Sequence, residues 1–191
     1  YVGEDDGRLT LKGRVACELT TTADELVLSE MVCGGLLHAL SPPEVAGLLS
    51  TFVSKGKVSK TLHVPPPLDE AHRALVALAT KMAVLQAEAG VLEGTAKDHV
   101  SSTLNAAMLE AAYHWTKGDT FDEVCQHTLL SEGDVIRVLS RTEELAKEVR
   151  AAARLLGDAL LSTKIDVVLT SIRRDIVAAP SLYTSSCFEL G

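Results

Sequence analysis

Proline and glycine divide this chain into alanine- and leucine-rich segments, and the division leaves little choice of fold. Apolar residues recur at helical spacing over residues 24–40, 68–90, 98–116 and 159–179. Alanine and leucine have high helix propensity, and aromatic residues, which sheets favour, are only 4% of the chain. The sequence therefore predicts an all-α protein, a bundle of several helices.

Two further helices are marked by capping signals at their starts. Residues 41–44 read Ser-Pro-Pro-Glu, in which serine caps the helix, proline begins it and glutamate reaches back to the serine N–H. This helix should run over residues 45–53. Ser131 opens a longer helix that reaches about Leu156. A short helix over residues 120–127 precedes it, and the two together resemble a helix-turn-helix.

Two other stretches are not expected to be helical. Asp-Asp-Gly at residues 5–7 lies between short apolar runs, which predicts a short N-terminal β-hairpin with a tight turn within residues 1–18. Residues 54–67 are polar, contain several lysines and end in three prolines. They are therefore predicted to form an exposed loop.

The charge balance limits what the chain can bind. Eighteen basic and 26 acidic residues give a net charge of −8, whereas a free-standing RNA-binding domain is normally basic. Any RNA contact should therefore be local and made by a few arginines. The same net charge fits an alternative function, a helical protein-interaction scaffold that does not bind RNA.

The lack of long apolar runs argues against a membrane protein, and the spacing of the cysteines argues against a disulfide-rich or zinc-binding protein. No run approaches the roughly 18 apolar residues that a membrane span needs, and no signal peptide is evident. We therefore expect a soluble, intracellular protein without a membrane partner. The four cysteines are scattered without a C-x-x-C spacing, which predicts free, buried thiols rather than disulfides or a zinc site. The six histidines show no ligand spacing either.

Four motifs, in order along the chain, carry a resemblance to a known family. They are Leu-Lys-Gly-Arg-Val-Ala-Cys-Glu at residues 11–18, Tyr-x-Trp-x-x-Gly-x-x-Phe at 113–121, Glu-Gly-x-x-Ile-Arg at 132–137 and Ile-Arg-Arg-Asp-Ile-Val-Ala-Ala-Pro-Ser-Leu-Tyr at 172–183. Together they resemble the C-terminal helical (DSHCT) domain of the Ski-type and Mtr-type DExH-box RNA helicases that act with the exosome. This suggests an N-terminal segment (1–18), a helical domain (19–183) and a tail (184–191).

The resemblance implies a role within a larger helicase. Such a helicase would move 3′ to 5′ on RNA, with ATP and magnesium bound by RecA-like motor domains that a chain this short cannot contain. This domain would close the RNA channel and help to pass the strand to the exosome, without a cofactor of its own. The implied partners are RNA, the motor domains, and subunits of the Ski complex or other exosome cofactors. Residues 84–91, 152–157 and 181–184 favour the cytoplasmic superkiller branch, with the nuclear branch as the alternative.

Four basic residues are candidates for RNA contact. Arg137 and Arg141 are four residues apart and project from one face of the long helix, and the resemblance places this helix along the RNA path. A guanidinium can stack on a base and hold a phosphate in a fork. Lys55 follows a Phe-Val element after which, as the resemblance implies, nuclear relatives have an acidic pair with one member close to RNA. Here that contact is either lost or replaced by the lysine. Arg174 is the fourth candidate.

The three arginine candidates have structural alternatives. Arg137 and Arg141 could belong to a solvated helix face with Glu144 and Glu148 as partners. Arg174, with its neighbours Arg173 and Asp175, could instead form an ion pair at a helix end. Trp115 and Tyr113 could stack on bases, but aromatic residues on an alanine-rich helix are more often part of the core.

Sequence patterns for catalysis and DNA binding are weak. Asp-Glu-Ala-His at residues 69–72 matches the hydrolysis box of DEAH helicases, but it opens a helix instead of ending a buried strand. No phosphate-binding loop is found, because Thr51 stands where Gly56-Lys57 would need its upstream glycine. No residue set suggests a nucleophilic triad. A DNA-binding helix-turn-helix is disfavoured because residues 132–134 would bring acids to phosphate.

Overall fold

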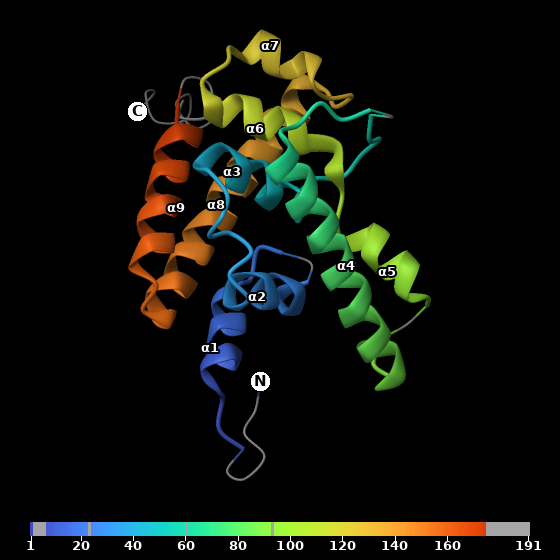
Figure 1. Cartoon of the computed structure of the whole chain (residues 1–191). Helices are drawn as coiled ribbons and strands as arrows, with labels where there is room; N and C mark the ends of the chain where they lie inside the picture. The colour runs from blue at the N-terminus through green and yellow to red at the C-terminus, as the bar shows by residue number, and fades with distance from the viewer. Residues whose placement is uncertain (2–6, 23, 60, 93, 175–191) are drawn as a thin grey trace, which may run out of the picture.

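A computed structural model describes residues 1, 7–22, 24–59, 61–92 and 94–174. All regular elements in these residues are helical, which confirms the all-α prediction (Figure 1). In chain order they are α1 (Leu11–Glu18), α2 (Glu25–Cys33), α3 (Pro42–Ser50), α4 (Pro66–Glu88), α5 (Ala96–Thr103), the 3₁₀ turn η1 (Ala106–Met108), α6 (Leu109–Lys117), α7 (Phe121–Gln126), α8 (Glu132–Leu156) and α9 (Ala159–Ile172). None of the described helices is long and apolar enough to cross a membrane.

Helix α3 lies at the centre of the bundle, where it packs against α4, α6, α8 and α9. It begins with the predicted capping box, in which the backbone N–H and the hydroxyl of Ser41 both donate to Glu44 Oε2 at 2.7 Å. Gly47 allows α6 to approach closely, because a Cβ at this position would lie 2.8 Å from the carbonyl oxygen of Leu109. A side chain at residue 47 would therefore push the two central helices apart.

Helices α8 and α9 run side by side and are joined by residues 157 and 158 (Figure 1). Helix α9 is also attached to α6 through Trp115, which is fully buried. Its Nε1 donates to the carbonyl oxygen of Ile172 at 3.0 Å, and its ring meets Phe121 edge-on. This confirms Trp115 as a core residue and excludes it as an exposed platform for bases.

The remaining helices pack around this centre. Helices α4 and α5 pair with each other, whereas α1 contacts α2 and α8. Glu148 of α8 fixes the link between α1 and α2, since its carboxylate accepts from the backbone N–H and hydroxyl groups of Thr20 and Thr21 at 2.8 to 3.0 Å. The part of α8 that comes after the candidate arginines is therefore hydrogen-bonded to the link between the N-terminal helices.

The predicted N-terminal hairpin is not shown in the described part of the chain. Leu11–Glu18 is helix α1, and Thr10 caps it by accepting a bond from the Gly13 N–H at 3.1 Å. Thr10 does donate its own N–H to the Tyr1 carbonyl at 3.0 Å, so the two segments lie side by side without forming a strand in the described residues. The predicted turn itself, at Asp5 and Asp6, lies outside those residues.

Two predicted helices have different limits in the structure. The helix expected over residues 24–40 ends at Cys33, just before the glycine pair. The helix expected over 98–116 is broken at Asn105, whose side chain accepts from the Ala107 N–H at 2.9 Å and so caps a new turn. The expected end of the last helix, near residue 179, lies outside the described residues.

Candidate nucleic-acid interface

Three of the four basic candidates line one groove. Lys55, Arg137 and Arg141 border a hollow of about 230 Å³, whose other lining residues are Val53, Asp134 and Val138. Lys55 comes from the link after α3, and both arginines come from the first half of α8. The fold therefore brings together basic residues that lie far apart in the sequence.

The two arginines on α8 are exposed and only lightly held. The side chain of Arg137 is 72% exposed, and its Nη1 pairs with Asp134 Oδ1 at 2.7 Å. Arg141 is also exposed, and its Nη2 donates to the Thr21 carbonyl oxygen at 3.3 Å. An exposed ion pair contributes only about 0–1 kcal/mol. A phosphate could therefore replace Asp134 as the partner of Arg137 at little cost.

The acidic partners predicted for these two arginines do not pair with them in the described residues. In the described part of the chain, Arg137 and Arg141 make no ion pair with Glu144 or Glu148. Glu148 instead holds the α1–α2 link. The acidic residue that does enter the groove is Asp134, whose Oδ2 accepts from Ser131 at the start of α8. Its i,i+3 spacing from Arg137 could have revealed this pair from the sequence.

The loop that carries Lys55 is fixed on both sides. Before it, the Ser54 hydroxyl donates to the carbonyl oxygen of Asn105. After it, the Asn105 Nδ2 donates to the Gly56 carbonyl oxygen at 3.0 Å. Gly56 has φ of 147°, and a Cβ there would lie 2.4 Å from Leu130 Cδ2. The backbone at Lys55 is therefore held beside α8 while its side chain remains exposed.

Arg174 does not line this groove. Its guanidinium carbon lies 3.8 Å from the centre of the Trp115 ring. Its Nη atoms donate to the carbonyl oxygens of Trp115, Gly118 and Asp119. These contacts close the C-terminal end of α6 against the end of α9. They favour a structural role for Arg174, made through carbonyl oxygens and the Trp115 ring, and an RNA contact by this residue stays a prediction.

The neighbouring Arg173 also makes a structural contact. Its Nε lies 2.6 Å from Glu143 Oε1, so it joins the end of α9 to α8. This agrees with the helix-end ion pair that was the alternative to RNA binding. The other predicted member of that group, Asp175, lies outside the described residues.

The DEAH-like sequence has the helical context that the sequence indicated. Asp69 lies in the first turn of α4, and its Oδ2 pairs with Arg73 at 3.0 Å in an exposed i,i+4 contact. It is not at the end of a buried strand, so the position of a metal-binding hydrolysis box is absent from this part of the fold.

The histidines and cysteines differ in part from expectation. Although the sequence offered no histidine ligand spacing, the fold brings Glu110, His114 and His127 together. The i,i+4 spacing of Glu110 and His114 was the signal available, but His127 arrives only through the fold. Among the described cysteines, Cys17, Cys33 and Cys125 are free as predicted. However, Cys17 is exposed, so the expectation of burial was wrong for it, and Cys33 and Cys125 are only half-buried.

Comparison with known proteins places these features in a family context. Residues 6–179 match the family described as the DSHCT (NUC185) domain. The chain is 36% identical to Superkiller complex protein 2 of Mus musculus over 184 residues, which cover 96% of this chain and 14% of that protein. It is 37% identical to Exosome RNA helicase MTR4 of Homo sapiens over 175 residues, or 92% of this chain and 16% of that protein.

A plant relative gives the same result. The chain is 32% identical to the DExH-box ATP-dependent RNA helicase DExH11 of Arabidopsis thaliana over 182 residues, which cover 95% of this chain and 13% of that protein. This chain thus spans less than a fifth of the length of each of these three relatives.

Proposed function

Since this chain belongs to the DSHCT (NUC185) domain family, we propose that it forms one wall of the RNA channel in a 3′-to-5′ ATP-dependent RNA helicase. The observation that supports this most is the groove in which Lys55, Arg137 and Arg141 meet. The groove gives local positive charge to a chain whose net charge is −8. A chain of this charge needs such a local patch to contact RNA.

The groove would hold RNA without reading its sequence. The arginine forks bind phosphate oxygens and can stack on any base, and the lysine adds a point charge. Asp134 would compete with phosphate for Arg137, because it already accepts from the Nη1 of that guanidinium. The hold would therefore be weak enough for the strand to advance when a motor pulls it, and the groove would hold the strand between strokes.

The chemical work would lie in the larger helicase. RecA-like domains of that protein would bind ATP and magnesium and drive translocation, and this domain itself would catalyse nothing. The names of the relatives support subunits of the superkiller complex, or the exosome and its cofactors, as partners. We place the helicase in the cytoplasm with the superkiller branch, and the nuclear branch is the alternative.

A protein-interaction scaffold is the second candidate function. It is favoured by the net charge of −8 and by a hollow of about 730 Å³ between α4 and α5. The residues that line this hollow include Val76, Val100 and Leu104, so its surface is largely apolar. A scaffold of this kind would bind a protein there and would not need the basic groove.

The test uses the complete helicase with Arg137→Ala and Arg141→Ala combined. We expect RNA unwinding to slow, while RNA-stimulated ATP hydrolysis and the melting temperature stay close to those of the parent. Arg73→Ala with Lys81→Ala is the matched control. It removes the same charge from exposed positions on α4, and Arg73 also has an aspartate partner.

The outcomes separate the two functions. Unchanged unwinding in the Arg137 and Arg141 variant would refute the channel role. A parent protein without RNA-stimulated ATP hydrolysis would refute the helicase assignment and favour the scaffold. A large fall in melting temperature would show that these arginines support the fold instead.

A further inference from the structure

We propose that Glu110, His114 and His127 form a binding site for a divalent transition metal, with Zn²⁺ as the best match. One possible ligand atom from each residue lies within 4.8 Å of the other two. Glu110 and His114 are one turn apart on α6, so they share a face, and His127 directly follows α7. This cluster is separate from the basic groove.

The donor set has the chemistry that Zn²⁺ prefers. Two imidazoles and one carboxylate are a common three-ligand set for zinc, with the fourth position left to water. The Glu110 side chain is only 5% exposed, so its carboxylate is held in a fixed place inside the protein. Its two oxygens are already directed, because Oε1 meets His127 Nδ1 at 2.8 Å and Oε2 accepts from the His63 backbone N–H at 3.0 Å.

An outer carboxylate holds one of the histidine ligands. Asp119 Oδ2 lies 2.5 Å from His114 Nδ1, so the Nε2 atom is the one left for a metal. A carboxylate behind a histidine ligand fixes its tautomer and raises its basicity, as in many zinc sites. With both histidines neutral, Glu110 and Asp119 together balance the charge of one Zn²⁺ ion.

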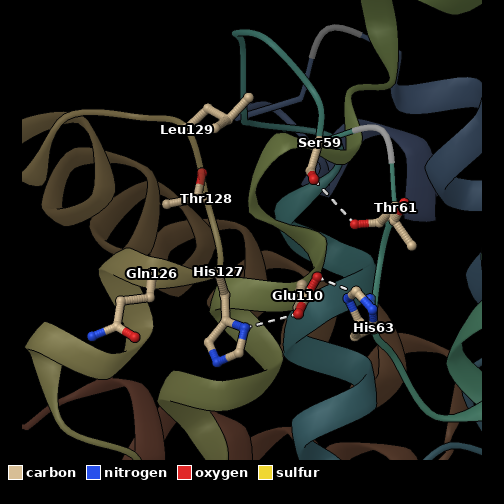
Figure 2. A pocket seen from close by; sticks show the side chains of 8 residues that line it. All are labelled: Ser59, Thr61, His63, Glu110, Gln126, His127, Thr128 and Leu129. Carbon is tan, nitrogen blue, oxygen red and sulfur yellow. Dashed lines mark hydrogen bonds and ion pairs between the residues drawn. The ribbon is translucent and has the colours of Figure 1, made fainter.

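Two of the three ligand residues face a hollow that opens to solvent. Glu110 and His127 line a hollow of about 340 Å³ together with His63 and Gln126. Figure 2 shows Glu110 between His127 and His63, with dashed lines to both. A metal could enter through this hollow, and a water molecule there could occupy its fourth position.

Binding would require a small rearrangement. The rings of His114 and His127 are stacked, with centroids 3.9 Å apart and an angle of 2° between their planes. Metal ligands bind through in-plane lone pairs, and two ligand atoms about 2 Å from Zn²⁺ lie roughly 3.3 Å apart at the tetrahedral angle. The rings must therefore turn toward each other, so metal binding should end the stacking.

A bound metal would stiffen the approach to α8. His127 begins the link that leads to α8, and in the same link the Thr128 hydroxyl donates to the Ala107 carbonyl oxygen at 2.7 Å. Glu110 of α6 already contacts His127 of this link, and a metal would tie His114 of α6 to His127 as well. Its effect would thus be to strengthen the connection between the central helix pair and the helix that carries Arg137.

The experiment is a titration of the chain, free of any histidine tag and metal, with Zn²⁺ by calorimetry and with Co²⁺ by visible absorption. We expect one Zn²⁺ per chain and a Co²⁺ spectrum with the intensity of a four-coordinate site. His114→Gln with His127→Gln should abolish both signals. Asp119→Asn should weaken binding by about 10–100-fold, as the loss of an outer partner does.

The control keeps the fold and changes another histidine. His38→Gln removes the exposed partner of Asp158 and should leave the affinity for Zn²⁺ unchanged. The Glu110→Gln variant keeps the shape of the side chain and tests the need for its charge. The proposal is overturned if the parent chain binds no Zn²⁺, or if its affinity persists in the His114 and His127 variant. The cluster would then be a hydrogen-bond network that supports α6.

Discussion

Arg174→Ala should destabilise the protein, because Arg174 closes the end of α6 in the structure. The substitution removes the cation–π contact with Trp115 at 3.8 Å, which is worth about 0.5–2 kcal/mol. It also removes three hydrogen bonds to carbonyl oxygens. Because the side chain is partly exposed, water can replace some of these bonds. We expect a total loss of about 2–3 kcal/mol, within the range of a lost buried network.

The assay is urea and thermal unfolding of the chain followed by circular dichroism. For a domain of this size, a loss of 2–3 kcal/mol lowers the melting temperature by roughly 5–10 °C. Arg137→Ala is the matched control, since its side chain is 72% exposed and its loss should change stability by no more than about 0.5 kcal/mol. Equal stability of the two variants would refute the anchoring role of Arg174 and restore it as a candidate for RNA contact.

Two further predictions concern the loop beside the groove and the N-terminal residue. Gly56→Ala should lower the unfolding free energy by about 1–3 kcal/mol, because its φ is 147° and the new Cβ would lie 2.4 Å from Leu130 Cδ2. The control Gly90→Ala also has a positive φ but open space around it, so it should cost less. Equal losses in urea unfolding would contradict a contribution from the clash with Leu130. Burial raises the pKa of Tyr1 from 10.0 to about 12. Tyr1 therefore ionises at a lower pH in the unfolded chain than in the folded protein. Its contribution to stability should be present below pH 10 and lost as the pH rises to about 12. Absorbance titration compared with Tyr1→Phe measures this, and ionisation near pH 10 in the folded protein would contradict it.

Much of the fold could be predicted because its signals are local. The Ser-Pro-Pro-Glu sequence at residues 41–44 predicted α3, since a capping box depends on residues only three apart. Ser131 marked the start of α8 for the same reason. The strands predicted from the Asp-Asp-Gly signal are not shown in the described residues, where Thr10 is an equally local signal and caps α1. Asn105 broke a helical pattern because its bonds to Thr51 and Gly56 come from another part of the chain.

The candidate site, too, could be predicted only where its signals are local in the sequence. The shared face of Arg137 and Arg141 follows from helical spacing, so the sequence predicts it. The position of Lys55 beside them depends on the packing of α3 against α8, which no spacing encodes. Arg174 lies in a motif that suggested RNA contact, yet only the fold reveals Trp115 beneath it. Likewise, His127 joins Glu110 and His114 through tertiary structure alone.

The most direct test of the basic groove is the affinity of the chain for single-stranded oligouridine as a function of salt concentration. Each phosphate contact on a single strand contributes about 0.7 to the slope of log affinity against log salt. Replacing Lys55, Arg137 and Arg141 with alanine should therefore reduce the slope by roughly 2 and weaken binding. The Arg73→Ala and Lys81→Ala control should leave both unchanged. Equal slopes and affinities for the parent and the triple variant would contradict the account.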